Sequence, residues 1–304
     1  MPDALLASPF HAGEREIQAR VGVRERMDQR GARAIRAFMP DQHRSFFGLL
    51  PFLPIAFEST DGWPAATMLT GAPGFISSPD PTTLRVAARM PTLRRGAAVG
   101  ILGIDLSTRR RNRANGRIAA VFPGGFDIAV EQSFGNCDQY IQARSVEATS
   151  TPPALRSEPL NGIDAPARAA IEAADTFFVA SASAAGMDMS HRGGRPGFVR
   201  VDGDTLTIPD FAGNRYFNTL GNFVLNPRAA LLFPDFATGD LLHLTGQVEF
   251  VWEGEEMRRF KGAQRLWRVH VVAGKRRRGA VALRWSRPEC APTTIATGTW
   301  RGSE

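Results

Sequence analysis

Residues 71–75, Gly-Ala-Pro-Gly-Phe, recur as Gly-Arg-Pro-Gly-Phe at residues 194–198, which lie 123 positions further along the chain. A second set of matches has an offset of 130 and pairs Leu102, Asp105, Thr108, Gly116 and Val121 with Leu232, Asp235, Thr238, Gly246 and Val251. Self-similarity at a fixed spacing indicates that one structural unit occurs more than once. The sequence therefore predicts two copies of one fold.

The second copy is longer than the first. The offset is 122 between Leu84 and Leu206 and 130 between Leu102 and Leu232, so the second copy contains eight residues that the first lacks. The extra residues fall around 214–218, with the sequence Asn-Arg-Tyr-Phe-Asn. We expect the elaborated copy to carry a ligand site and the shorter copy to act as its lid or pseudo-partner.

Short apolar stretches separated by Gly and Pro predict a mainly β fold with flanking helices. Asp202-Gly203 lies between two alternating stretches and predicts a tight hairpin turn. The expected strands are 52–58, 65–70, 74–77, 83–86, 100–106, 116–122 and 126–130 in the first copy, and 177–183, 197–201, 205–208, 242–252 and 264–271 in the second. The expected helices are 12–38, a short one after Asp41, one from Asp164 to Ala174, and 214–226 before Pro227.

These patterns divide the chain into five segments. A helical N-terminal segment (1–50) precedes the first, reduced copy (51–148). A linker (149–163) that contains Pro152, Pro153 and Pro159 follows. The second copy (164–290) and a short tail (291–304) complete the prediction.

The charge of the chain favours small anions over nucleic acid. The 304 residues have a net charge of +7, but Lys261 and Lys275 are the only lysines and most arginines are scattered. Guanidinium groups bind phosphate and carboxylate through paired hydrogen bonds. The run at 109–113, Arg-Arg-Arg-Asn-Arg, aligns with a hairpin of the second copy, and we expect an exposed turn there, with a patch for an anion or a partner as the alternative.

Other functional classes lack their sequence signals. No apolar run approaches the ~20 residues that span a bilayer, and the N-terminus does not resemble a signal peptide. With only Cys137 and Cys290, a disulfide framework is not expected, and a cytoplasmic protein is predicted. We expect Cys137 to be a packed loop cysteine. The histidines and cysteines lack metal-ligand spacing, and neither G-x-S-x-G nor a strand-linked G-x-G-x-x-G occurs.

A strand at 205–208 that leads into a helix near Asn214 would present free backbone N–H groups at the edge of the sheet. Such helix starts bind phosphate. Arg215 in the first turn opposes the helix dipole, which favours cations at the other end. An arginine in this position indicates an anion for it to face.

The order of these segments resembles the FMN-binding split-barrel proteins related to pyridoxamine 5′-phosphate oxidase. The resemblance rests on Ser190-His191-Arg192, the strand Thr-Leu-Thr-Ile-Pro-Asp at 205–210, Gly213-Asn214-Arg215, and Leu-Asn-Pro-Arg-Ala-Ala-Leu-Leu-Phe at 225–233. It covers 176–252 well and 41–145 loosely through the repeat. It implies two tandem split β-barrels.

The resemblance also implies a site for FMN in the second copy. Ser190, His191 and Arg192 would contact the flavin, Ile208 and Pro209 would lie along the ring or ribityl chain, and Asn214 and Arg215 would hold the phosphate. The family pattern has a Lys where this chain has Tyr216 and a Gln where it has Leu241. A counterpart of the Arg/His pair that holds pyridoxamine phosphate is not found, so flavin binding is expected rather than vitamin B6 chemistry.

The implied function is that of a flavin-dependent oxidoreductase acting on a small molecule, with a flavin or nicotinamide reductant. Because such barrels commonly dimerise around FMN, the two copies would form an internal pseudo-dimer, with 70–75 or 134–140 as a wall over the ring; a homodimer of whole chains stays open. The alternatives are a protein that binds flavin, deazaflavin or haem without turnover, with His243 or His270 as a haem ligand, and a partner module of a separate reductase.

Overall fold

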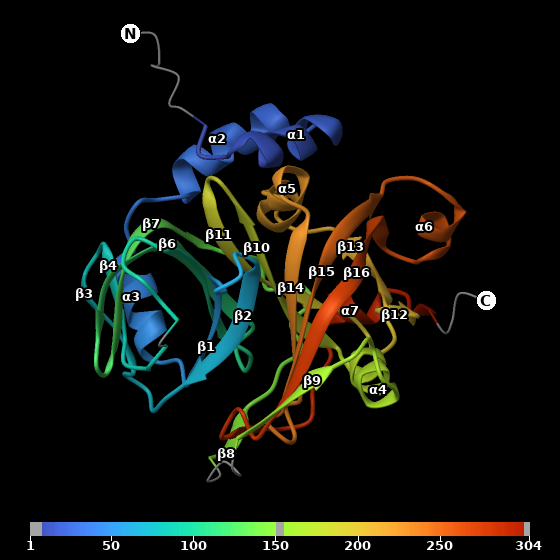
Figure 1. The fold of residues 1–304 in the computed structure, drawn as a ribbon. Helices are drawn as coiled ribbons and strands as arrows, with labels where there is room; N and C mark the ends of the chain where they lie inside the picture. Colours follow the sequence, from blue (N-terminus) through green and yellow to red (C-terminus); the bar gives the residue numbers. More distant parts are fainter. Residues whose placement is uncertain (1–7, 91, 150–154, 301–304) are drawn as a thin grey trace, which may run out of the picture.

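Two large antiparallel sheets lie side by side in the protein (Figure 1). The computed structural model describes residues 8–90, 92–149 and 155–300. The first sheet consists of β1 (Phe52–Glu58), β2 (Pro64–Thr70), β3 (Ile76–Asp80), β4 (Thr83–Val86), β5 (Ala98–Asp105), β6 (Arg110–Phe122) and β7 (Gly125–Gly135). The second consists of β9 (Arg156–Leu160), β10 (Thr176–Ser183), β11 (Gly186–Gly193), β12 (Arg200–Asp202), β13 (Thr205–Phe211), β14 (Arg228–Pro234), β15 (Leu241–Val251) and β16 (Ala263–Arg278).

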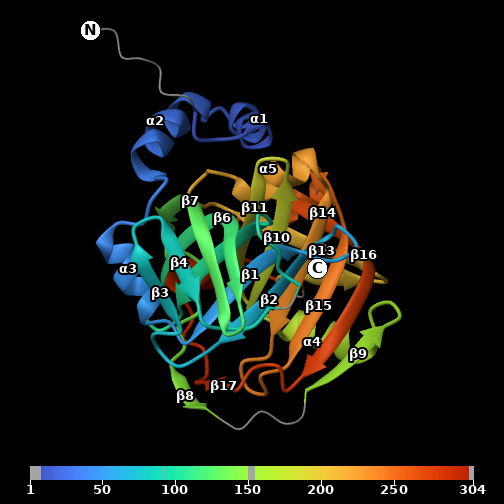
Figure 2. The same cartoon turned by 60° about the vertical axis from the view of Figure 1, so that its left-hand side comes forward.

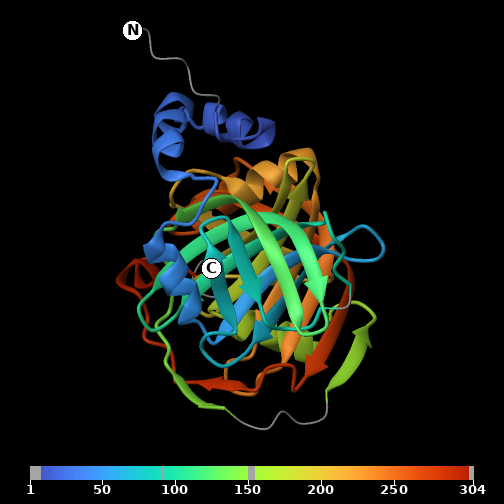
Figure 3. The ribbon, with the colours of Figure 1, turned by 90° about the vertical axis from the view of Figure 1, so that its left-hand side faces the viewer.

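The order of the strands confirms the internal duplication. The first sheet has the order β2-β1-β5-β6-β7-β4-β3, and the second has β11-β10-β14-β15-β16-β13-β12, with β9 added beside β16. Each strand of the first sheet thus has a counterpart at the same place in the second. The predicted mainly β fold of two tandem barrels with flanking helices is confirmed. Figure 3 shows the first sheet from outside, where it curves around its own core.

The helices before the two sheets are also paired. α3 (Asp41–Gly48) precedes the first sheet and α4 (Ala165–Ala173) precedes the second. α4 begins as predicted, because Asp164 Oδ1 accepts a hydrogen bond of 2.7 Å from the backbone N–H of Ala167. The prediction of one helix over 12–38 is wrong. The chain instead forms α1 (Ala12–Arg20) and α2 (Arg24–Ala34), because Gly22 takes a left-handed conformation at φ 68° between them.

The insertion in the second copy contains a helix that the first copy lacks. α5 (Asn218–Leu225) lies between β13 and β14, whereas the described residues between β4 and β5 contain no helix. α1 packs on α5, and Figures 1 and 2 show α1 and α2 above the end of the second sheet where α5 lies. Gly13 and Gly221 let these helices approach closely, since a Cβ on Gly13 would lie 2.0 Å from the carbonyl oxygen of Gly221.

Three apolar clusters hold the two sheets. One fills the first barrel around Phe47 and Phe126, and one fills the second barrel around Phe177 and Trp267. The third lies between the sheets and includes Phe52, Leu102, Phe178, Leu232 and Trp285. Apolar burial therefore joins the two copies along their seam as well as inside each one.

The connecting segments contain more secondary structure than expected. The segment 149–163, expected as a linker, includes β9, which pairs with β16; its residues 150–154 lie outside the described part. β8 (Val146–Thr149) pairs with β17 (Leu283–Trp285), so the end of the first copy contacts the end of the second. α6 (Glu255–Arg259) interrupts the second copy, and α7 (Pro292–Ile295) lies in the predicted tail. The helices of the described residues include none that is long and apolar enough to cross a membrane.

Candidate functional site

A cavity of about 120 Å³ lies between the two copies. The first copy contributes β6 and the segment after β7, and the second contributes β11, the end of β13 and the start of α5. Its polar and charged lining residues are Arg111, Arg113, Asn136, Cys137, Gln139, Tyr140, Ser190, His191, Arg192, Asp210, Asn214, Arg215, Asn218, Thr219 and Gln264. Of the two segments expected as a wall, 134–140 lines this cavity and 70–75 does not.

The structure brings six of the seven predicted flavin-contacting residues together. Residues 190–192 on β11, Pro209 on β13, and Asn214 and Arg215 before α5 all line the cavity. Ile208 does not line it, because it is fully buried in the core of the second barrel. Ile208 packs in that core with Leu206 and Trp267 instead. The roles of these residues in binding stay predictions.

The loop before α5 has a strained backbone. The helix begins at Asn218 rather than at Asn214 as predicted, because Arg215 and Phe217 each adopt a left-handed conformation at φ 63°. Tyr140, on the other side of the cavity, has the same φ. Such conformations cost roughly 1–3 kcal/mol for residues with side chains and gather at functional sites. The strain therefore places Arg215 in a loop at the cavity rather than within a helical turn.

Two arginines of the site lie in the segment that we expected to be an exposed turn. Only Arg109 is in the turn; β6 starts at Arg110, and Arg111 and Arg113 both line the cavity. The expectation of an exposed turn at 109–113 is therefore wrong for these two residues. Their spacing of two residues places both side chains on one face of a strand. This spacing of two residues was the feature of the sequence that could have indicated a shared, inward-facing position for Arg111 and Arg113.

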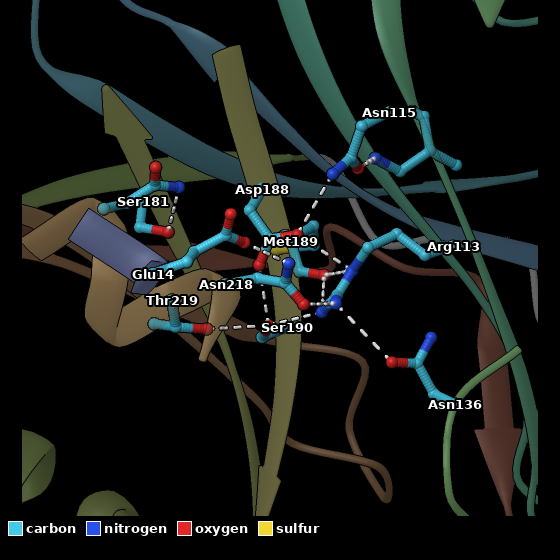
Figure 4. Close-up of polar contacts among 12 residues, drawn as sticks. Glu14, Arg113, Asn115, Asn136, Ser181, Asp188, Met189, Ser190, Asn218 and Thr219 are labelled. Carbon is cyan, nitrogen blue, oxygen red and sulfur yellow. Dashed lines mark hydrogen bonds and ion pairs between the residues drawn. The ribbon is translucent and has the colours of Figure 1, made fainter. Parts of the chain in front are cut away.

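Arg113 ties the two sheets together at the cavity (Figure 4). Its Nε lies 2.8 Å from Oδ1 of Asp188, and both side chains are almost fully buried. Its Nη2 donates to the carbonyl oxygen of Met189 and to Oγ of Ser190. Its Nη1 donates to Oδ1 of Asn218, at the start of α5, over 2.8 Å. The charge of Arg113 is thus balanced within the protein, and this arginine positions β11 and α5.

Arg111 forms no ion pair with the carboxylates that the structure describes, although Asp138 lies near enough to raise its pKa slightly. Its guanidinium donates to the backbone oxygens of Cys137 and Gln139 and to Nδ1 of His191. Burial, with repulsion from Arg113 as a lesser cause, lowers the pKa of Arg111 to about 10, so it remains a cation at neutral pH. Arg215 likewise forms no ion pair with the residues that the structure describes. Both arginines are half-buried, and a cation held partly away from water without a counter-charge favours an anionic ligand beside it.

His191 is neutral and keeps one polar atom unsatisfied. Burial, and then the nearby Arg111 and Arg192, lower its pKa well below the usual value. Because Nδ1 accepts the hydrogen bond from Arg111, the proton of the neutral ring resides on Nε2. Nε2 is buried and has no partner among the described residues, and the same holds for Nε of Arg192 and Nδ2 of Asn136. Buried polar groups normally have a hydrogen-bond partner, so these unpaired nitrogens indicate that a ligand with acceptor atoms binds in the cavity.

The charges of the lining add up to an excess of cations. Arg192 shares Asp210 with Arg265, which leaves this carboxylate surrounded by two guanidinium groups. Four arginines line the cavity against the single carboxylate of Asp210. The arrangement is suited to binding a phosphate or another small anion.

Glu14 of α1 is a buried carboxyl group that contacts Asn218 at the start of α5. Its Oε1 accepts from Asn218, and burial raises its pKa to about 7 from 4.5. Between these two pH values the unfolded chain has lost the proton and the folded chain has kept it. We expect the free energy of unfolding to fall as pH rises through this window, by at most about 3 kcal/mol. Urea unfolding at about pH 5 and about pH 8 should show a larger loss for the wild type than for Glu14→Gln.

Glu16→Gln is the matched control for this prediction, because Glu16 lies on the same helix but is exposed. It should keep the pH dependence of the wild type. Identical pH profiles for the wild type and Glu14→Gln would show that Glu14 does not titrate in this range.

The remaining candidate residues are dispersed. Cys137 is half-buried at the cavity wall and its Sγ lies 3.5 Å from Oδ1 of Asp138. His270 on β16 contacts Thr205 of β13 and Glu249 of β15, and it does not line the cavity. His243 lies at a different cavity, described below. Among residues 8–90, 92–149 and 155–300, no group of three metal-binding side chains occurs.

One family model matches the second copy of the repeat. Residues 163–289 match the family model for pyridoxamine 5′-phosphate oxidase. No curated protein matches the chain. Similar solved structures include HupZ of Group A Streptococcus (16% identity, 38% of this chain and 98% of that chain, TM-score 0.31), an FAD-binding protein of Mesorhizobium loti (13%, 41% and 99%, 0.30) and a putative pyridoxamine 5′-phosphate oxidase of Listeria innocua (15%, 34% and 88%, 0.27). Residues 163–289, which make up less than half of the chain, are therefore similar to the pyridoxamine 5′-phosphate oxidase family.

Proposed function

We propose that the cavity between the two copies binds the phosphate end of FMN and that the protein is a flavin-dependent oxidoreductase acting on a small molecule. The observation that carries the proposal is that Arg111 and Arg215, from different copies, line one cavity and form no ion pair with any carboxylate of residues 8–90, 92–149 and 155–300. The family match supports it, because residues 163–289 include the whole second-copy side of the site.

The hydrogen-bond donors of the cavity match the acceptors of a flavin nucleotide, but the volume of the cavity is too small for the whole molecule. Phosphate and ring carbonyl oxygens are acceptors, and they match the unpaired nitrogens of His191, Arg192 and Asn136. Pockets for whole cofactors usually enclose roughly 300–1,000 Å³. The 120 Å³ of this cavity therefore suits the phosphate and the adjoining chain, and the ring system would extend beyond it.

A bound flavin would supply the hydride or electron transfer. The residues of this chain would bind and orient it. Arg215 would hold the phosphate, Arg111 would add positive charge from the first copy, and the neutral His191 would donate one hydrogen bond through Nε2. A flavin or nicotinamide reductant and the small-molecule substrate would bind in turn beside the flavin at the same cavity. Since one chain supplies both walls, the site does not need a second chain.

We expect the purified protein to show the absorption bands of oxidised flavin or to acquire them on addition of FMN. The cavity binds the phosphate, so FMN should remain with the protein through gel filtration. A protein that stays colourless with excess FMN would contradict the proposal, as would a Soret band in place of the flavin bands.

Arg215→Ala should weaken FMN binding roughly 10- to 100-fold, since a hydrogen bond to a charged group contributes about 1.5–3 kcal/mol. Riboflavin lacks the phosphate and should bind the variant and the wild type alike. Quenching of flavin fluorescence measures both affinities. Arg94→Ala removes an exposed arginine that does not line the cavity and should leave both affinities unchanged. An equal loss for FMN and riboflavin would refute the phosphate role.

A further inference from the structure

A second and larger cavity lies on the seam between the two sheets. Its volume is about 720 Å³, and it is lined by β2 of the first copy and by parts of β14, β15 and β16 of the second. Figures 1 and 2 show β2 beside β14 and β15 at this seam. None of its lining residues belongs to the cavity around Arg111 and Arg215.

The repeat relates the second cavity to the first. Residues 67–70 line it, and an offset of 123 places them at the positions of residues 190–193, which line the first cavity. Residues 88–90 stand at the positions of 210–212, with an offset of 122. His243 stands at the position of Arg113, with an offset of 130. The two cavities are therefore the two equivalent sites of the internal pseudo-dimer.

One hydrogen bond demonstrates this equivalence at the level of atoms. Arg113 donates to the carbonyl oxygen of Met189 at the first cavity. At the second, His243 Nδ1 lies 3.0 Å from the carbonyl oxygen of Ala66, which is the repeat position of Met189. The same backbone contact thus crosses the seam at both sites, once from an arginine and once from a histidine.

The chemistry of the second cavity differs from that of the first. It lacks a counterpart of α5 and has no arginine at the β2 positions that match 190–193, where Thr67, Met68, Leu69 and Thr70 stand instead. Its exposed lining is more apolar than polar, with Trp63 and Met90 among its walls. The second cavity therefore lacks the groups that would bind a phosphate at the first cavity, and it has room for an apolar group.

Cations surround this apolar space. Arg89, Lys275 and Arg277 line it and pair with no carboxylate of the described residues, whereas Asp61 is the only acidic residue of the lining. His243 stays neutral, since burial and then Lys275 and Arg277 lower its pKa to about 3. Because its Nδ1 donates to a carbonyl, its buried Nε2 is an acceptor without a partner among the described residues.

We propose that this cavity is a second binding site, for a small molecule with an apolar body of one or two rings and an anionic carboxylate or sulfonate. The apolar walls take the rings and Lys275 and Arg277 bind the anion. A hydroxyl or N–H group on the ligand supplies the donor that His243 lacks. This site is distinct from the flavin site and does not depend on it.

The probe for the test is 8-anilinonaphthalene-1-sulfonate, which combines rings, an N–H group and an anion. Its fluorescence should rise on binding and saturate at one molecule per chain. 1-Naphthoate should displace it, and the neutral 1-naphthalenemethanol should do so at least tenfold less well, because it lacks the charge. Equal displacement by both would overturn the role of the cations.

Substitutions in the lining of the second cavity test whether the probe binds there. Lys275→Glu combined with Arg277→Glu should weaken binding about tenfold or more, whereas Lys261→Glu, which reverses the other lysine outside the cavity, should have no effect. Ala273→Trp should block the cavity from an exposed position of β16. Its control, Ala129→Trp, places the same side chain at an exposed position of β7 outside both cavities.

A last experiment distinguishes binding of the probe at the second cavity from binding at the flavin site. Arg215→Ala and saturation with FMN should leave the probe in place. Loss of the probe in either case, with Ala273→Trp harmless, would locate it in the first cavity and overturn the proposal. Because the displacement series and the cavity variants are measured without FMN, failure of flavin binding alone leaves those measurements unaffected.

Discussion

Arg113→Met should lower the free energy of unfolding by about 3–5 kcal/mol, because it leaves Asp188 as a buried carboxylate without its cation. Exposed ion pairs contribute only about 0–1 kcal/mol. Arg117 pairs with Glu131 at 3.1 Å on the surface of the same strand, so Arg117→Met is the matched control and should cost no more than that. Urea unfolding measures both.

A second substitution separates charge from packing in this prediction. Asp188→Asn in the Arg113→Met background removes the uncompensated charge while it keeps an oxygen for Asn115 to donate to. It should recover part of the lost stability. If Arg113→Met costs no more than Arg117→Met, the contacts of Arg113 across the seam do not stabilise the fold.

Trp267→Ala should destabilise the protein by about 3–5 kcal/mol, as expected when a large buried aromatic side chain is truncated. Trp267 is fully buried in the second barrel, where it packs against Phe177 and Phe223. Its indole N–H has no partner among the described residues, so Trp267→Phe removes volume without breaking a hydrogen bond and should cost much less. The measurement is again urea unfolding.

Trp63→Ala is the control for this prediction, since Trp63 is only partly buried near the end of β2. It should have the smaller effect. A loss for Trp267→Phe as large as that for Trp267→Ala would show that the indole nitrogen contributes through a contact such as a buried water.

The fold was largely predictable because each strand carries its own pattern. Alternating and apolar stretches marked most strands, the repeat related the two copies, and Asp164 marked the start of α4. The break at Gly22 was missed because the apolar spacing continues across it, and a glycine inside a helical pattern is often tolerated. The paired order of the two sheets depends on distant strands, and the repeat alone implied it.

On the side of the first copy, the sequence predicted only a wall at 70–75 or 134–140, of which 134–140 lines the cavity, and it predicted no arginine there. The segment 190–192 and Arg215 were found because they follow strands and surround the insertion. Arg111 and Arg113 were missed because alignment with a hairpin of the second copy suggested an exposed turn. Burial of these arginines depends on β6 meeting β11 across the seam, some 75 residues away in the chain, and no local pattern contains that contact.

The amino-acid sequence by itself determined the duplication, the β content and the position of the inserted helix, since each follows from spacing and local preference along the chain. Only the tertiary structure decided which cations remain without a counter-charge. Asp188 neutralises Arg113, while Arg111 donates its hydrogen bonds to neutral groups. The charge at a site depends on distances between residues far apart in sequence, and packing of the two copies sets those distances. The same packing produced a second cavity at the equivalent position, with a different lining that has no counterpart of α5.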